Sequence, residues 1–393
     1  MDKVFAKANE IFDEIVEIRR DIHMHPERGH QEFRTAGIIR EKMKEYGVDE
    51  ILTPTETSTI AVIKGRKGPG KTVGIRADID ALPVTEDTGL EFASVNEGVM
   101  HACGHDLHAS MMIGNAKILC DMRDDFAGTV KVIFQHSEEI QPGGSREILA
   151  TGMLDDCDAF FGMHVQPTEG DVGKIMIKSG PVCTSGDMVH IDVHGKGGHG
   201  SQPHKANDAI LAACQLNVLF NQIQARNVDP MEVAVLSINT INGGLAENIM
   251  AGECHLSGSP RAYNPEVRQT IHDKMIEICK GVEIFSGCKI DCDYTFGYDA
   301  VINDNDLFQT VIDDWTKCLG EDFFAIMEKP QTFSEDYSFY STKTGKPSVM
   351  FFLNGGHMRD LATLHNAKCS FNEECIPYGM TAMSHAALAF LAK

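Results

Sequence analysis

The chain has 393 residues, of which 42% are hydrophobic and 23% are charged, and its formal net charge at pH 7 is −22. Such an acidic surface repels phosphate backbones and anionic lipid headgroups, so we expect neither a nucleic-acid partner nor a membrane partner. This length favours two domains that fold without a structural metal or disulfide, so any metal that is bound should serve chemistry.

The first segment predicts a helix and not a targeting signal. Residues 4–20 have helical apolar periodicity and carry acidic side chains, whereas a signal peptide has a basic end and an apolar centre. No stretch approaches the roughly 20 uninterrupted apolar residues of a membrane span. We therefore expect a soluble, cytoplasmic protein, and in that reducing compartment most of the 12 cysteines should be buried free thiols.

Strands and helices then alternate along the chain. Residues 35–46 predict a helix with Thr35 as its N-cap and Gly47 at its C-terminal end. Runs of β-branched or apolar residues predict strands at 59–63, 72–75, 129–134, 158–163 and 348–353. Helical periodicity predicts helices at 108–122, 143–152 and 305–319. The last two strands are apolar at odd and even positions, which is typical of strands covered on both faces.

The segment 187–296 has a different order of elements. Strand, helix, strand, strand, helix and strand are predicted at 188–193, 206–225, 232–241, 252–261, 265–280 and 289–296. This is the β-α-β-β-α-β order of a ferredoxin-like module. We therefore predict a catalytic α/β domain with helices around a mixed sheet, formed by residues 1–186 and 297–393. A ferredoxin-like α+β lid or dimerisation domain at 187–296 interrupts it.

Two clusters of ionisable residues could carry chemistry. The run His101-Ala102-Cys103-Gly104-His105-Asp106-Leu107-His108 offers a thiol and three imidazoles, which suit zinc, cobalt or manganese. The pair Glu138-Glu139 follows a predicted strand, at the end where open α/β sheets bind ligands. One glutamate could ligate a metal while the other holds a proton. Taken separately, each cluster could also be a solvated polar loop.

Two single histidines, His164 and His365, also lie at or just beyond predicted strand ends. Each alone would more often be a buried structural histidine than a ligand. Together with the two clusters, however, they could meet around one pocket.

These residues, with the motifs RADIDALPV (76–84), GGHG (197–200) and SED (334–336), resemble the metal-dependent aminoacylase–carboxypeptidase superfamily. The nearest branch holds hippurate hydrolases, N-acyl-L-amino-acid amidohydrolases and indole-acetyl-amino-acid hydrolases. The resemblance runs over nearly the whole chain.

The resemblance implies two divalent metal ions per subunit, which would be zinc, manganese or cobalt. Cys103 would be the ligand that both ions share. His105 and His164 would complete one metal site, and Glu139 and His365 would complete the other.

The resemblance also implies catalytic and substrate-binding roles. Glu138 would be the general base and acid, taking a proton from a metal-bridging water and passing it to the leaving amine. Asp78 would orient a ligand or tune this base. His199 would donate to the oxyanion from the partner subunit of a dimer, and Asn248 and Arg261 would bind the substrate carboxylate.

The sequence therefore predicts a homodimeric di-metal hydrolase that cleaves the amide bond of N-acyl amino acids or related small conjugates. A dipeptidase or carboxypeptidase with the same site is the alternative, and a metal-dependent binding protein without turnover is a second. Two departures from the family pattern lie near the pocket. His136-Ser137 stands where many relatives have Pro-Ala, and Cys369 stands where an aromatic residue is common.

Overall fold

The computed structural model describes residues 2–359 and 361–393, and the chain separates into two compact units. The first comprises Met1–Val182, Ile302–Pro330 and Asp336–Lys393, and the second comprises Cys183–Val301 and Gln331–Glu335. Among the described residues, no helix combines the length and the apolar character that crossing a bilayer requires.

The first unit is built on an eight-stranded mixed sheet in the order β1-β2-β4-β3-β5-β16-β6-β15. Its strands are β1 (Glu50–Leu52), β2 (Thr59–Lys64), β3 (Thr72–Asp78), β4 (Thr129–Gln135), β5 (Ala159–Gln166), β6 (Ile175–Ile177), β15 (Phe324–Ile326) and β16 (Ser348–Asn354). The central strands β4, β3, β5 and β16 run parallel to one another. Their carboxyl ends therefore meet at one edge of the sheet, where open α/β sheets bind ligands.

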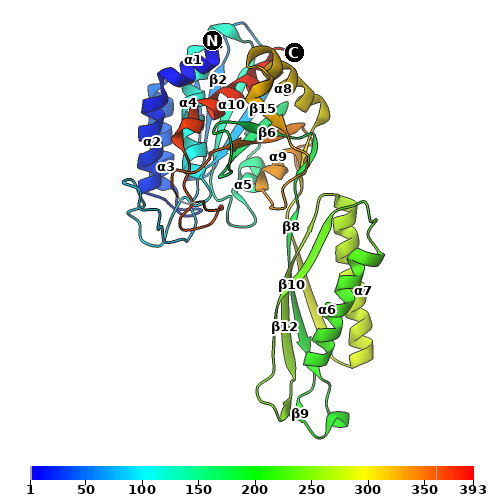
Figure 1. Ribbon diagram of the computed structural model, residues 1–393. Helices are drawn as coiled ribbons and strands as arrows, with labels where there is room; N and C mark the ends of the chain where they lie inside the picture. The colour runs from blue at the N-terminus through cyan, green and yellow to red at the C-terminus, as the bar shows by residue number, and fades with distance from the viewer. Residues whose placement is uncertain (1, 360) are drawn as a thin grey trace. The chain divides into compact units, whose positions relative to one another are not determined.

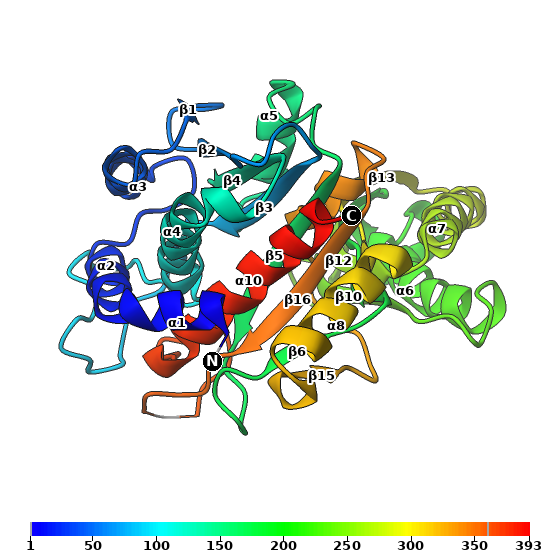
Figure 2. The ribbon, with the colours of Figure 1, turned by 90° about the horizontal axis from the view of Figure 1, so that it is seen from above.

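Helices cover this sheet. They are α1 (Lys3–Glu10), α2 (Phe12–Met24), α3 (Phe33–Glu45), α4 (His105–Asp121), α5 (Gly144–Ala150), α8 (Asn305–Cys318), α9 (Phe339–Thr342) and α10 (Ile376–Leu391). Figure 2 shows α10 lying between α4 and α8 across the sheet. Short 3-10 turns complete the unit at η1 (Arg123–Asp125), η3 (Glu321–Phe323), η4 (Asp336–Ser338) and η5 (Glu373–Cys375).

The first two predicted helices, at 4–20 and 35–46, have different ends in the structure. The helix predicted at 4–20 is divided at Ile11 into α1 and α2. Thr35 is not an N-cap, because α3 already begins at Phe33 and the carboxylate of Glu27 accepts from the amides of Arg34 (2.9 Å) and Thr35 (2.8 Å). A side chain from the preceding loop thus satisfies the free amides of the first turn. Gly47 follows the helix with φ 67°, as predicted.

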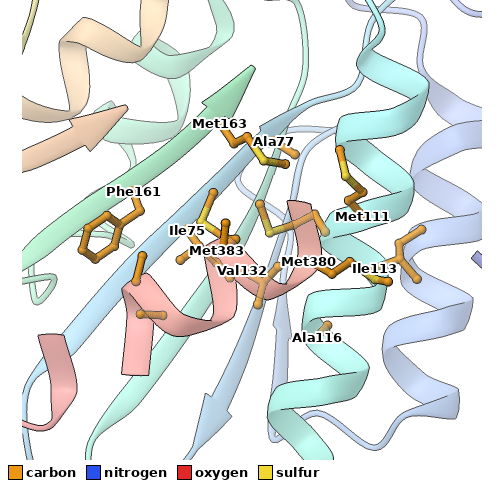
Figure 3. Packing of buried hydrophobic residues seen from close by; sticks show 14 of the residues in the cluster. Ile75, Ala77, Met111, Ile113, Ala116, Val132, Phe161, Met163, Met380 and Met383 are labelled. Atoms are coloured by element: carbon orange, nitrogen blue, oxygen red, sulfur yellow. The ribbon is translucent and has the colours of Figure 1, made fainter. Parts of the chain in front are cut away.

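The core of the first unit lies between the sheet and the helices α4 and α10 (Figure 3). Met380 and Met383 of α10 pack with Met111 of α4 and with the strands. Gly114 permits this close approach, since a Cβ there would lie 2.2 Å from Sδ of Met380. The sequence analysis did not predict α10. This helix is buried along nearly its whole length, so it lacks the one-sided apolar pattern of a surface helix.

A buried histidine joins three of these helices. His385 of α10 lies with Nδ1 2.7 Å from Asp314 of α8 and Nε2 3.0 Å from Asp2, the N-cap of α1. Burial lowers the pKa of His385, but the two carboxylates raise it above its usual range.

The second unit holds an antiparallel four-stranded sheet in the order β10-β12-β8-β13. Its strands are β8 (Gly186–His194), β10 (Ala234–Gly243), β12 (Glu253–Ala262) and β13 (Lys289–Tyr298). Two helices, α6 (Ala209–Arg226) and α7 (Pro265–Ser286), pack side by side on this sheet (Figure 1). In chain order the elements are β-α-β-β-α-β, so the predicted ferredoxin-like module and the α/β sheet of the other unit are both confirmed.

Smaller elements complete the chain. A short pair, β9 (Gly198–His199) and β11 (Ile249–Met250), and the turn η2 (Pro203–Lys205) belong to the second unit. Strand β7 (Gly180–Cys183) pairs with β14 (Val301–Asn303).

Candidate metal centre

The Cys103 loop reaches the carboxyl end of β5 because the residue after Cys103 is a glycine. Gly104 has φ 84°, a left-handed conformation that favours glycine, and α4 begins immediately after it. A Cβ on Gly104 would lie 2.4 Å from Cγ1 of Val165. Free of that clash, the loop places Sγ of Cys103 3.4 Å from Nε2 of His164, which lies near the end of β5.

The structure brings the five predicted ligands together in two sets that share Cys103. One set is Cys103, His105 and His164, and the other is Cys103, Glu139 and His365. Within each set the donor atoms lie within 4.8 Å of one another. The amide of His365 donates to the carbonyl of Ala102 (2.9 Å), which holds the His365 loop against the Cys103 loop.

The two sets differ in exposure. Cys103, His105 and His164 are buried, whereas Glu139 is partly exposed and the side chain of His365 is 53% exposed. The second set therefore faces solvent, where a small substrate could enter.

The donor atoms are oriented as ligands require. The Nδ1 atoms of His105 and His164 lie within hydrogen-bonding distance of the carbonyls of Asp80 (2.9 Å) and Val165 (2.6 Å). A carbonyl only accepts, so each Nδ1 carries a proton and each Nε2 is the atom left to bind a metal. Nε2 of His105 is buried, and no residue that the structure describes hydrogen-bonds to it. It lies 4.0 Å from Oε1 of Glu139, which is 3.2 Å from Nε2 of His365. Three imidazoles, a thiol and a carboxylate fit borderline divalent cations.

The electrostatics of the two sets favour a bound cation. Burial and the nearby carboxylates of Glu139 and Glu138 raise the pKa of the Cys103 thiol well above its usual range. Glu139 also raises the pKa of His365. A metal would therefore have to displace protons from these groups, and in return it would neutralise the surrounding carboxylates.

Asp80 holds the glutamate pair and one predicted ligand, and the sequence analysis did not single it out. Its Oδ1 accepts from the amide of Glu138 and its Oδ2 from that of Glu139, each at 3.0 Å. Nδ1 of His105 lies 3.3 Å from Oδ1. Burial raises the pKa of Asp80, but the bond from His105 and the charge of that ring lower it, so this residue is a carboxylate.

Asp78, the aspartate that the sequence analysis selected, lies beside the centre. Its Oδ1 is 2.5 Å from Nδ1 of His108, and its Oδ2 is 2.7 Å from Nη1 of Arg76 and 3.6 Å from Nε2 of His105. Nε2 of His108 accepts from the amide of Val165 (2.8 Å), so both nitrogens of that ring are occupied. His108 therefore serves as a structural link between Asp78 and β5.

Glu138, the predicted general base, is 6% exposed. Its Oε1 lies 3.5 Å from the amide of Asp336, a residue of the SED motif. The loop that carries Glu138 thus packs against Asp336.

The remaining predicted residues lie in the second unit. His199 and Asn248 line one hollow of about 740 Å³ at the short β9–β11 pair. Arg261 lies near the opposite end of β12 from Glu253, which also lines this hollow. Nη1 of Arg261 is buried and has no hydrogen-bond partner among residues 2–359 and 361–393. The structure therefore groups His199 with Asn248 and leaves Arg261 apart from them.

Comparison with known proteins decides the family. The family model for peptidase family M20/M25/M40 matches residues 74–389. The chain belongs to this family. It is accordingly a metallohydrolase of the amidohydrolase and peptidase kind, and the resemblance that the motifs indicated is confirmed.

Three similar proteins illustrate the range of the M20 family. An N-acyl-L-amino acid amidohydrolase of Geobacillus stearothermophilus is 40% identical over 77% of this chain and 81% of its own. Thermostable carboxypeptidase 1 of Saccharolobus solfataricus is 34% identical over 99% of this chain and 98% of its own. The crystal structure of the Bacillus subtilis YXEP protein, described as a dinuclear metal binding peptidase from the M20 family, superposes with a TM-score of 0.83 at 31% identity. It covers 98% of this chain and 99% of that one.

Proposed function

We propose that this M20 hydrolase uses two metal ions to cleave the amide bond of N-acyl amino acids or related small conjugates. The observation that carries the proposal is the pair of donor sets that share Cys103. The amidohydrolase relative supports the substrate class, and the dinuclear relative supports the number of metals.

The five ligands would hold two divalent ions, zinc, manganese or cobalt, with Cys103 common to both. When bound, such ions lower the pKa of a water molecule and polarise the carbonyl of the scissile amide. The chain contributes the geometry of the site. Asp80 fixes the backbone of the glutamate pair, and the carbonyls of Asp80 and Val165 fix the two imidazoles.

Glu138 would move the proton. Its carboxylate would accept a proton from the attacking water and then give that proton to the nitrogen of the leaving amine. Glu138 is nearly excluded from solvent, and the amides of Glu138 and Asp336 restrain its loop. A general base held in this way would need little reorganisation during the reaction.

Substrate recognition would use the second unit. An arginine binds a carboxylate through two parallel hydrogen bonds, and Nη1 of Arg261 is a buried donor to which no described residue supplies an acceptor. The eight residue-to-residue steps along the strand from Glu253 to Arg261 span about 26 Å at roughly 3.3 Å per step. His199 and Asn248 therefore lie too far from Arg261 to hold the same small substrate within one subunit. A homodimer in which His199 and Asn248 act at the partner's site would remove this conflict.

Carboxypeptidase activity is the second candidate, because the Saccharolobus relative aligns with 99% of this chain. A substrate panel separates the candidates. We expect N-acetyl, N-benzoyl, N-succinyl or indole-acetyl amino acids to be hydrolysed in the presence of zinc, manganese or cobalt, with much slower cleavage of unblocked dipeptides. Efficient cleavage of unblocked dipeptides, or of longer N-blocked peptides alone, would contradict the amidohydrolase assignment.

A further inference from the structure

A second cluster of potential ligands lies outside the metal centre. It consists of His30 in the loop between α2 and α3, His136 directly after β4, and Glu147 in α5. One donor atom from each residue lies within 4.8 Å of the other two. Nε2 of His136 is 3.1 Å from Oε2 of Glu147, and the rings of His30 and His136 meet edge to face with centroids 5.2 Å apart.

Backbone packing brings these three segments together. A Cβ on Gly29 would lie 2.8 Å from Oγ of Ser137, and a Cβ on Gly144 would lie 2.0 Å from the carbonyl oxygen of His136. Only glycine fits such close approaches, so the His30 loop and the start of α5 both abut the segment that contains His136. The cluster is thus assembled by the fold itself, before any ligand binds.

The chemistry of the cluster suits a transition metal. Two imidazoles and one glutamate form the three-ligand set that binds zinc in proteins and leaves a fourth position open. Metal–ligand bonds of about 2.0–2.2 Å place donor atoms roughly 3.3 Å apart in a tetrahedral site, so small side-chain rotations would complete it. Burial lowers the pKa of His136, although Glu147 opposes this shift, and a neutral imidazole offers its lone pair.

A hydrogen bond between His136 and Glu147 explains part of this arrangement but not His30. The backbone of His30 has φ 64°, which is unfavourable for a residue with a Cβ. Its imidazole is exposed, and no residue that the structure describes hydrogen-bonds to it. A metal bond would give this ring a partner and would offset the cost of its backbone conformation.

We propose that His30, His136 and Glu147 form a third divalent-metal site that binds zinc or cobalt. His136 lies two residues before Glu138 in the chain, so an ion bound to His136 would anchor the backbone that leads to the proposed general base.

Zinc binding to the full-length protein tests the proposal. The wild type and its variants would be dialysed against graded free zinc, and the zinc bound per subunit would be measured by elemental analysis. The variants are His30→Asn and Glu147→Gln, and His25→Asn is the matched control from the same loop. Asparagine tolerates the left-handed backbone at position 30, and Glu147 is half exposed, so the variants should fold.

We expect the wild type and His25→Asn to bind one more equivalent of zinc than His30→Asn and Glu147→Gln. The number of ions at the Cys103 centre does not affect this difference. In cobalt-loaded protein, the extra equivalent should lack a thiolate charge-transfer band, because the third site contains no cysteine. The proposal would be overturned if all four proteins bound the same amount of zinc at the same free-zinc concentrations. It would also be overturned if the extra cobalt gave a thiolate band, or if His25→Asn lost the same equivalent of zinc.

Discussion

Asp80 offers a direct test of how the metal centre is held in place. Its two carboxylate oxygens accept the amides of Glu138 and Glu139 at 3.0 Å, and the same carboxylate lies 3.3 Å from the ring of His105. In Asp80→Asn one oxygen becomes an NH₂ group, which would face a backbone N–H or the His105 N–H. At least one bond to a charged acceptor is therefore lost.

The size of the effect follows from that lost bond. A hydrogen bond to a charged group contributes about 1.5–3 kcal/mol. His105 and Glu139 are both proposed ligands, so most of this loss should fall on metal binding. At roughly 1.4 kcal/mol per factor of ten, the affinity for metal should fall about 10- to 150-fold.

Competition with a coloured chelator would measure this affinity in the wild type, in Asp80→Asn and in Asp87→Asn. Asp87 is the matched control, because it lies in the same region of the chain and its side chain is 77% exposed. We expect the control to bind metal like the wild type. If Asp80→Asn binds metal within twofold of the wild type and hydrolyses substrate equally well, the orienting role of Asp80 is refuted.

Three further predictions concern single residues. Cys103→Ala should lose most of its metal in elemental analysis while Cys120→Ala keeps it, and full occupancy in Cys103→Ala would exclude Cys103 as the shared ligand. His199→Ala should be nearly inactive though metal-loaded. Subunit exchange with Glu138→Gln should restore about a quarter of wild-type activity, since half of the dimers are mixed and one of the two sites in each mixed dimer is intact. Confirmed exchange without recovery would rule out action in trans. His385 has a folded-state pKa above its unfolded value of about 6.5, so its contribution to the free energy of unfolding is complete below that pH and is lost as the pH rises through the raised pKa. His385→Gln should therefore cost more stability at about pH 6 than at about pH 9 in urea titrations, and equal losses would contradict this sign.

The sequence was most informative where residues of unusual type are concentrated. The spacing of Cys103 and His105, and the pair Glu138-Glu139 after a strongly β-forming run, are rare features, and the structure brings them together at the carboxyl ends of parallel strands. The order of elements in the second unit could also be predicted, since each strand and helix there has its own apolar period.

Other features depend on tertiary contacts that a single sequence does not reveal. Asp78 and Asp80 are two residues apart, so strand alternation places them on the same side and cannot tell which one contacts the glutamate pair. Helix α10 is surrounded by other elements and so has no polar face to mark it. Thr35 has the composition of an N-cap, but Glu27, eight residues earlier, caps the first turn of α3 instead.

The adjacent glutamates test the account most directly, because it gives them different tasks. Metal content and turnover of an N-acyl amino acid would be measured on the same samples of Glu138→Gln and Glu139→Gln. Glu138→Gln should keep both metals and lose about 2–4 orders of magnitude in kcat, the usual contribution of a general base. Glu139→Gln should lose metal together with activity. The account would be contradicted if Glu138→Gln lost its metals or stayed as active as the wild type, or if Glu139→Gln remained fully metal-loaded.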